Sequence, residues 1–197
     1  GQAGAGAMAD ALFGKVNPSG KLNETWPLAL EENPSYPYYP AKERTAEHRE
    51  GLYIGYRYYD TAGVPVRYPF GYGLSYTTFS VGEAAIAKKA NGYVDVTIPI
   101  KNTGTRTGSE VLQIYVKALK DVNGPSKSLR AFKRVELKPG KGMDVTFQLE
   151  PEAFSFFDEK SNTMICADTE DVEYTLYYGT SSREEDLKSL PIVIAGK

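Results

Sequence analysis

The segment "YVDVTIPIKN" at residues 93–102 determines the class of fold predicted for this chain. Branched aliphatic residues stand at every second position of this segment, at Val94, Val96, Ile98 and Ile100. Successive side chains of a β-strand point to opposite faces, so this two-residue period is typical of a strand with one buried face. The segment therefore predicts a half-buried strand of an antiparallel sheet.

Further segments on the C-terminal side have the length and composition of strands. They are separated by turns rich in Gly, Pro and Asn, and they read "SEVLQIYVKAL" (109–119), "SLRAFKRVEL" (128–137), "MDVTFQLEP" (143–151), "VEYTLYYGTSS" (172–182) and "SLPIVIAG" (189–196). Short strands at this spacing predict an antiparallel β-sandwich rather than a parallel sheet. With roughly seven strands over about 120 residues, this part of the chain is long enough to bury its own core.

The chain before residue 76 gives weaker structural signals. A short helix is predicted within residues 1–14, where Met8 and Leu12 are one turn apart and Gly14 provides a stop. The sequence "NPSG" at 17–20 predicts a type I turn. Residues 21–49 are rich in proline and lack periodicity, which predicts an extended connector. A single helix and a connector bury too little apolar surface to fold alone, so we expect residues 1–68 to be the edge of another, incomplete domain.

Residues 50–79, "EGLYIGYRYYDTAGVPVRYPFGYGLSYTTF", are rich in tyrosine and glycine and match neither a helix nor a strand. A tyrosine ring buries apolar area while its hydroxyl can reach a polar rim. Two interpretations follow. The rings form a clamp against surfaces of other domains, or they pack beneath the sandwich and cover one of its open ends.

Composition argues against several classes of function. The net charge of −2 gives no reason to expect nucleic-acid binding. No window of the sequence is apolar enough to predict a membrane span, and the N-terminus lacks the features of a signal peptide, so we expect a cytoplasmic bacterial protein. Cys166 is the single cysteine, which fits a reducing compartment. His48 is the single histidine and lies in a polar stretch, so we expect a solvated side chain and predict no metal site, cofactor or histidine-based nucleophile.

Several longer motifs resemble one enzyme family. The segments "ADALFGKVNPSGKL" (9–22), "EGLYIGYRYYD" (50–60) and "YPFGYGLSYTTF" (68–79) resemble the tail of glycoside hydrolase family 3 enzymes, typified by β-glucosidases. Downstream, "IKNTGTRTGSEVLQIYV" (100–116), "SLRAFKRVELKPGKG" (128–142) and "YTLYYGTSS" (174–182) are similar to the fibronectin type III-like domain that ends many of those enzymes. The resemblance covers nearly the whole chain.

This resemblance implies an architecture and a role. Residues 1–26 would be the C-terminal remnant of an α/β sandwich domain, residues 27–75 an interdomain connector or clamp, and residues 76–197 the fibronectin type III-like β-sandwich. The partners would be the barrel and α/β sandwich domains of a parent enzyme, which would hydrolyse terminal β-D-glucosidic bonds of a carbohydrate substrate with retention. This chain would stabilise and position those catalytic domains.

The resemblance also implies that the catalytic groups lie elsewhere. Retaining glycosidases need two carboxyl groups about 5–5.5 Å apart. In the family the nucleophile belongs to the barrel and the acid/base to the α/β sandwich, and neither motif occurs in this sequence. The carboxylates available by composition are Glu24, Glu50 and Asp60, and no spacing holds two of them on one rigid element. We therefore predict no catalytic residue here.

Five residues are candidates for a supporting position around a site or an interdomain contact. Gln2 would follow the end of a strand of the α/β sandwich, and such strand ends border sites in α/β folds. Tyr56, Arg57 and Tyr58 would hold loops around the sugar pocket, and Glu50 would hold the clamp in place, with Arg57 as a possible partner. The alternative role for all five residues is packing between domains.

Two other functions remain open. The chain could be a carbohydrate-binding or protein-interaction module, because fibronectin-like sandwiches expose loops and faces that carry aromatic rings. The candidate rings are Phe154, Phe156, Phe157, Tyr174, Tyr177 and Tyr178, although their alternation favours core packing for several of them. A complete enzyme within this chain is the third interpretation.

Overall fold

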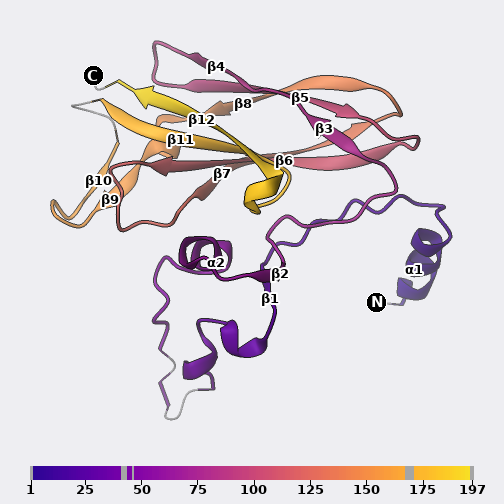
Figure 1. The fold of residues 1–197 in the computed structure, drawn as a ribbon, viewed down its shortest axis with the longest axis horizontal. Coiled ribbons are helices and arrows are strands. Elements are labelled where there is room, and N and C mark those ends of the chain that lie inside the picture. The colour runs from indigo at the N-terminus through magenta and orange to yellow at the C-terminus, as the bar shows by residue number, and fades with distance from the viewer. Residues whose placement is uncertain (1, 41–43, 46, 167–170, 196–197) are drawn as a thin grey trace. The chain divides into compact units, whose positions relative to one another are not determined.

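The structure is a computed structural model that describes residues 2–40, 44–45, 47–166 and 171–195. It is mainly β, and the strand pairs that it describes are antiparallel, as predicted (Figure 1). The chain divides into two compact units of three segments each. The first unit consists of Gly1–Lys21, Gly73–Leu112 and Phe132–Glu150, and the second of Leu22–Tyr72, Gln113–Ala131 and Pro151–Lys197.

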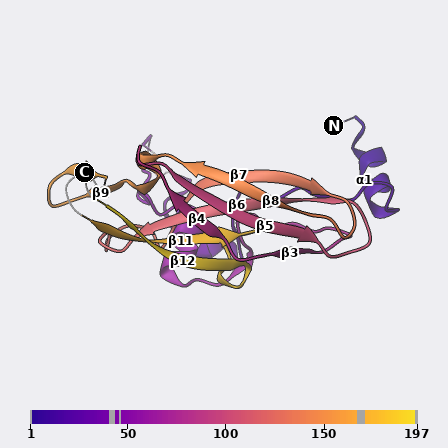
Figure 2. The same ribbon diagram turned by 90° about the horizontal axis from the view of Figure 1, so that it is seen from above.

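The first unit is organised around one central strand. This strand is β5 (Val94–Asn102), and its neighbours are β3 (Phe79–Val81), β4 (Ala85–Lys88) and β8 (Gly142–Leu149) (Figure 2). β8 pairs along one edge of β5, whereas β3 and β4 pair with different halves of β5. The break between these two short strands coincides with Pro99, whose carbonyl oxygen accepts a bond from the Gly82 amide at 2.8 Å. Proline has no N–H to continue the ladder, so two short strands take the place of one long strand.

The predicted alternation along β5 is confirmed. Val94, Val96, Ile98 and Ile100 are at most 2% exposed, and they contribute to the core of the first unit. On β8, Val145, Phe147 and Leu149 face Ile98, Val96 and Val94 and are buried in the same way, whereas Met143, which faces Ile100, is exposed. The two-residue period thus identified both the strand and its buried face.

Asn102 is a fully buried polar residue at the end of β5, and its side chain makes four hydrogen bonds. Its Nδ2 donates to the carbonyl oxygens of Arg106 and Leu137 at 2.8 and 2.9 Å. Its Oδ1 accepts from the Thr77 hydroxyl at 2.7 Å and from the Gly104 amide at 3.0 Å. Because both polar atoms are hydrogen-bonded, these bonds offset the cost of removing the amide from water while they fix the loop after β5.

The N-terminal helix α1 (Gly4–Leu12) forms as predicted, and Gly14 follows it with a positive φ of 70°. The predicted turn at 17–20 is wrong, because these residues have no turn conformation. The Asn17 side chain instead bonds to two segments that are distant in the sequence. Its Nδ2 donates to the Thr107 carbonyl oxygen at 2.9 Å. Its Oδ1 accepts from the Tyr76 amide at 2.8 Å and from the Ser75 hydroxyl at 3.1 Å. These bonds to distant residues replace the local hydrogen bonds of a turn.

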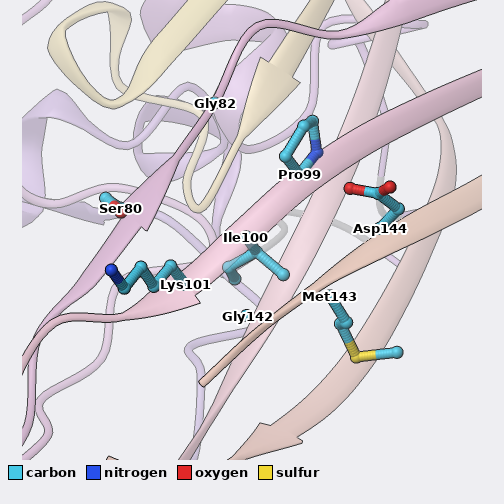
Figure 3. Close-up of a pocket in the computed structure, with 8 residues that line it drawn as sticks. All are labelled: Ser80, Gly82, Pro99, Ile100, Lys101, Gly142, Met143 and Asp144. Carbon is cyan, nitrogen blue, oxygen red and sulfur yellow. The ribbon is translucent and has the colours of Figure 1, made fainter. Parts of the chain in front are cut away.

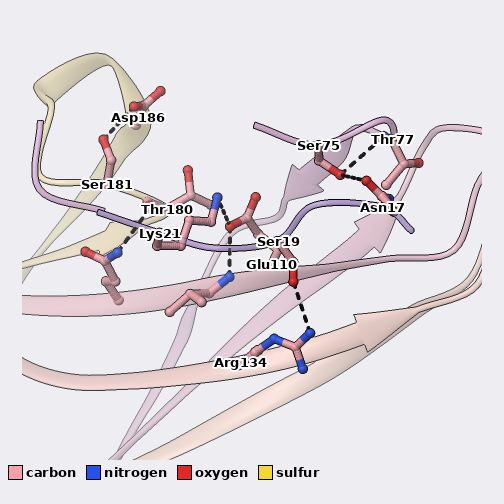
Figure 4. A network of polar contacts seen from close by, with 12 residues as sticks. Asn17, Ser19, Lys21, Ser75, Thr77, Glu110, Arg134, Thr180, Ser181 and Asp186 are labelled. Carbon is pink, nitrogen blue, oxygen red and sulfur yellow. Dashed lines mark hydrogen bonds and ion pairs between the residues drawn. The ribbon is translucent and has the colours of Figure 1, made fainter. Parts of the chain in front are cut away.

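Two further polar contacts hold the segment after α1 against the strands of the first unit (Figure 4). Lys21 forms an ion pair with Glu110 at 2.5 Å, and both side chains are largely buried. The Arg134 guanidinium donates to the Ser19 hydroxyl at 3.1 Å. In contrast, the helix α1 itself has no buried residue.

The second unit contains most of a four-stranded sheet and two small ribbons. The sheet order is β12-β11-β6-β7, with β6 at Gly108–Ala118, β7 at Ser128–Leu137, β11 at Val172–Gly179 and β12 at Leu187–Ile194. The ribbons are β1 (Trp26–Pro27) with β2 (Val66–Tyr68), and β9 (Phe156–Asp158) with β10 (Thr163–Ile165). The short helices are η1 (Leu30–Glu32), η2 (Tyr36–Tyr38), α2 (Tyr56–Ala62), η3 (Pro151–Phe154) and η4 (Glu184–Asp186).

Large aromatic side chains fill the core of the second unit. Tyr115, Tyr174, Tyr178 and Phe154 are at most 1% exposed, and the rings of Phe154 and Tyr174 meet edge to face with centroids 5.3 Å apart. β6 is buried along almost its whole length, which is why its sequence alternates less clearly than that of β5.

Candidate functional site

The candidate site is the helix α2 together with the cavities beside it. A helix here was not predicted, because aromatic and β-branched residues are weak helix formers and no long apolar period exists. Two glycines delimit it: Gly55 has a φ of 56° and Gly63 lies in the left-handed region with a φ of 65°. The "AG" at its C-terminal end was therefore the one local signal for a helix stop.

The inward side of α2 packs on the sheet of the second unit. Tyr56 and Tyr59 are buried, and the Tyr56 ring lies 5.2 Å from the Phe70 ring and 5.5 Å from the Tyr115 ring. The Tyr56 hydroxyl accepts a hydrogen bond from the Leu129 amide at 2.8 Å. Within this unit, Tyr56 therefore packs on the sheet, as one of the two interpretations expects, whereas the Tyr59 ring is buried beside the Tyr58 ring, with centroids 5.1 Å apart.

Asp60, one turn after Tyr56, forms an ion pair with Lys127 at 2.8 Å. The two side chains are 17% and 9% exposed. Burial raises the pKa of the Asp60 carboxyl above its ordinary value, while Lys127 and the Ser182 hydroxyl oppose this increase. Burial, with smaller contributions from Tyr56 and Asp60, also raises the pKa of Tyr115. The Asp60 carboxylate therefore takes part in a structural ion pair with Lys127. The sequence did not indicate this partner.

One cavity beside α2, which we call the tyrosine pocket, has a volume of about 410 Å³. Its lining consists of Pro34, Tyr38, Arg49, Glu50, Tyr53, Tyr58, Thr61 and Ala62. Two of the candidate residues, Glu50 and Tyr58, thus come together here. Arg49 lies over the Tyr38 ring, 4.7 Å from its centroid.

A second cavity beside α2, which we call the arginine pocket, has a volume of about 250 Å³. Arg57 and Arg130 both line it, together with residues of the loop after β6 and of the β9–β10 ribbon. Arg57 therefore lines a different cavity from Glu50, and no ion pair joins these two side chains among the described residues. Arg130 was missed in the sequence because nothing in "SLRAFKR" shows that its side chain lines the same cavity as Arg57.

The remaining candidates lie apart from α2. Gln2 is exposed in the turn before α1, in the first unit. Glu24 and His48 are exposed residues of the second unit. Glu50 lines the tyrosine pocket and Asp60 pairs with Lys127, so the three candidate carboxylates do not meet at one cavity. Within the described ranges, no group of three or more His, Cys, Asp and Glu side chains is arranged to hold a metal ion.

The rings considered for carbohydrate stacking are mostly core residues. Phe154, Tyr174 and Tyr178 are at most 1% exposed and Phe156 is 9% exposed, whereas Phe157 is 46% exposed. A sugar-binding platform requires ring faces that are open to solvent. These strands therefore provide core packing rather than such a platform.

A third cavity, in the first unit, has a volume of about 400 Å³ and lies over β5 and its neighbours (Figure 3). Lys101, Asp144 and Ser80 supply its polar groups, and Met143 is its largest exposed apolar side chain. None of the described residues that line it carries an aromatic ring. Among the described residues, moreover, no helix is both long and apolar enough to cross a bilayer.

Comparison with known protein families gives two matches. Residues 1–76 match the glycosyl hydrolase family 3 C-terminal domain, and residues 110–182 match the fibronectin type III-like domain. Together these two matches account for the aromatic connector with α2 and for most of the sheet to which α2 is attached.

Individual relatives give the same result. The chain is 44% identical over 192 residues to thermostable beta-glucosidase B of Acetivibrio thermocellus, covering 95% of this chain and 25% of that protein. It is also 44% identical to a xylan 1,4-beta-xylosidase of Xylanibacter ruminicola, over 98% of this chain and 21% of that protein. The chain thus spans about a quarter of the length of these relatives.

Solved structures agree with the sequence matches. The Bifidobacterium adolescentis GH3 beta-glucosidase superposes with a TM-score of 0.88 at 39% identity, covering 98% of this chain and 28% of that one. Beta-glucosidase 3B of Thermotoga neapolitana, in complex with glycerol, gives a TM-score of 0.84 at 33% identity, covering 99% and 27%. The chain therefore belongs to glycoside hydrolase family 3 and corresponds to the C-terminal region of its enzymes, β-glucosidases among them.

Proposed function

We propose that this chain is the supporting, non-catalytic C-terminal part of a larger β-glucosidase-type enzyme. The parent would hydrolyse terminal β-D-glucosidic bonds with retention, and this region would stabilise and position its barrel and α/β sandwich domains. Residues 1–26 would complete the α/β sandwich, 27–75 would form the connector, and 76–197 would form the fibronectin-like domain. We further propose that the parent is a cytoplasmic bacterial protein.

One observation carries this proposal: the uneven distribution of exposed apolar side chains. Among the described residues, 14 of the 21 exposed large apolar side chains lie before residue 77. The same part of the chain supplies only two of the 23 buried core residues, Tyr56 and Tyr59. Large exposed apolar patches mark interaction surfaces, so this distribution favours a segment that is covered by other domains.

The exposed residues follow the elements that would meet those domains. Met8, Leu12 and Phe13, in and directly after α1, are 65%, 80% and 84% exposed. In the connector, Leu30, Tyr39 and Ile54 are 66%, 79% and 66% exposed. Gln2, Glu50 and Tyr58 would then contribute to interdomain contacts rather than to chemistry.

The first experiment measures hydrolysis of an aryl β-glucoside by the purified chain. The thermostable beta-glucosidase B of Acetivibrio thermocellus serves as the positive control. We expect no turnover by the chain beside an active control, because its carboxylates do not form a catalytic pair. Turnover that survives repurification and is lost in the Glu50→Gln variant would contradict the proposal.

The second experiment tests the supporting role directly. The C-terminal quarter of the Acetivibrio enzyme is deleted, or replaced by this chain at the boundaries of the 192-residue match. We expect the deletion to lose activity or thermal stability and the chimera to regain a large part of both. A deletion variant as active and stable as the intact enzyme would refute the supporting role.

A further inference from the structure

The arginine pocket contains two guanidinium groups that have no carboxylate partner within the part of the chain that the structure describes. Arg57 extends from α2 and Arg130 from the start of β7, and both line the same cavity. Arg130 Nη2 donates to the Ser155 carbonyl oxygen at 2.9 Å, which fixes one edge of its guanidinium. Within the described part of the chain, no carboxylate oxygen lies within 4.0 Å of either guanidinium.

The two arginines influence each other electrostatically. Burial and the charge of Arg57 both lower the pKa of Arg130. The groups that oppose this decrease are the phenols of Tyr56 and Tyr174, not a carboxylate. Two like charges at one cavity are unfavourable, and an anion bound between them would remove this repulsion.

The acidic residues that line the same pocket are engaged elsewhere. The Asp121 carboxylate faces the Lys117 ammonium at 4.0 Å. The Glu159 carboxylate accepts a hydrogen bond from Asn123 Nδ2 at 3.0 Å. The guanidinium groups therefore stay available to a ligand from outside this chain.

Apolar side chains at the same pocket restrict the kind of ligand. Leu52 is 57% exposed, and Phe157 and Met164, which face each other across the β9–β10 ribbon, are 46% and 61% exposed. Inorganic anions and free acetate would leave these side chains in water. An acidic side chain with apolar neighbours would cover them.

From this arrangement we propose that the arginine pocket binds the carboxylate of an Asp or Glu side chain that a polypeptide presents between apolar residues. Arg57 and Arg130 hold the carboxylate oxygens, since guanidinium groups match carboxylates in a bidentate geometry. Leu52, Phe157 and Met164 cover the flanking apolar residues. This inference rests on the proposed supporting role, because it specifies the chemistry of one surface that a neighbouring domain would meet.

The test uses the isotope-labelled chain and short blocked peptides. Acetyl-Leu-Glu-Leu-amide is titrated while the side-chain Nε–H signals of the arginines are followed by NMR, and acetyl-Leu-Gln-Leu-amide and D-glucuronate are titrated in parallel. We expect saturable shifts of Arg57 and Arg130 with the Glu peptide only. We also expect Arg57→Gln and Arg130→Gln each to weaken binding by roughly tenfold, because charge-assisted hydrogen bonds are lost. Arg67→Gln is the matched control, because Arg67 is exposed and does not line the pocket.

Each alternative outcome is decisive. Equal binding of the Glu and Gln peptides, or shifts that are equally large at Arg67, would overturn the carboxylate assignment. Tighter binding of glucuronate through the same two arginines would overturn the polypeptide as occupant and point to an acidic sugar. The comparison of the two peptides needs only the unaltered chain, so misfolded variants cannot obscure it. If the peptides fail to bind while the chimera with the Acetivibrio enzyme is active, this inference is wrong and the supporting role stands.

Discussion

Replacing Asp60 by Asn should destabilise the chain substantially, because it leaves a buried ammonium group without its counter-charge. Asp60 and Lys127 are 2.8 Å apart, and only 17% and 9% of their side chains are exposed. Removing one partner of a buried ion pair typically costs about 3–5 kcal/mol. The residual exposure allows some hydration of Lys127, so we expect a loss of about 2–3 kcal/mol in the free energy of unfolding.

The same reasoning predicts a different result when both charges are removed. In Asp60→Asn with Lys127→Met, no unpaired charge remains, and we expect the double variant to lose about 1–3 kcal/mol less than the sum of the single variants. Urea denaturation followed by circular dichroism measures all four free energies of unfolding. At this chain length the single Asp60 variant should also melt about 4–12 °C lower.

The control is an exposed ion pair in the same chain. Asp10 and Lys15 are 3.0 Å apart, but their side chains are 44% and 72% exposed, so Asp10→Asn should change stability by less than about 1 kcal/mol. A stabilising coupling between Asp60 and Lys127 is refuted if the effects of Asp60→Asn and Lys127→Met add up to within about 0.5 kcal/mol of the effect of the double substitution. Equal effects of Asp10→Asn and Asp60→Asn would also refute it, because burial is the only reason given for a difference.

Two further predictions test separate features of the structure. Tyr56→Phe removes only the acceptor of the Leu129 amide and should cost about 1–2 kcal/mol, and the loss should be confined to stability, with an unchanged far-ultraviolet spectrum. Asn102→Ala removes the hydrogen-bond partner of four polar groups, in two buried and two partly buried bonds, and should cost about 3 kcal/mol in a urea titration, whereas a loss below about 1 kcal/mol would show that water replaces the amide.

Within the β-sandwich, the sequence predicted the strands wherever one face of a strand is buried. The alternation from Val94 to Ile100 identified both β5 and its core face. The short strands β3 and β4 were missed because each has at most four residues, which is too short to display a period. Along β11 the alternation did assign the rings, because Tyr174 and Tyr178 are buried and Tyr177 between them is half-buried. Phe156 and Phe157 could not be assigned in this way, because β9 has only three residues.

Local signals were less informative before residue 76. The turn predicted at 17–20 does not form, because the Asn17 side chain bonds to residues about 60 and 90 positions away. The helix α2 was missed because its stability comes from contacts of Tyr56 and Asp60 with β6 and with residues 127–129 rather than from helix propensity.

By itself the sequence determined the mainly β fold, the antiparallel strands of the sandwich and the family, since periodicity and motifs are properties of contiguous residues. Only the tertiary structure decided the roles of the charged side chains around α2. It paired Asp60 with Lys127, separated Glu50 from Arg57, and brought Arg57 to Arg130, more than 70 positions further along the chain. The physical reason is that the partner of a charged group is set by which strands lie beside the helix, and that proximity arises only when the sheet has formed.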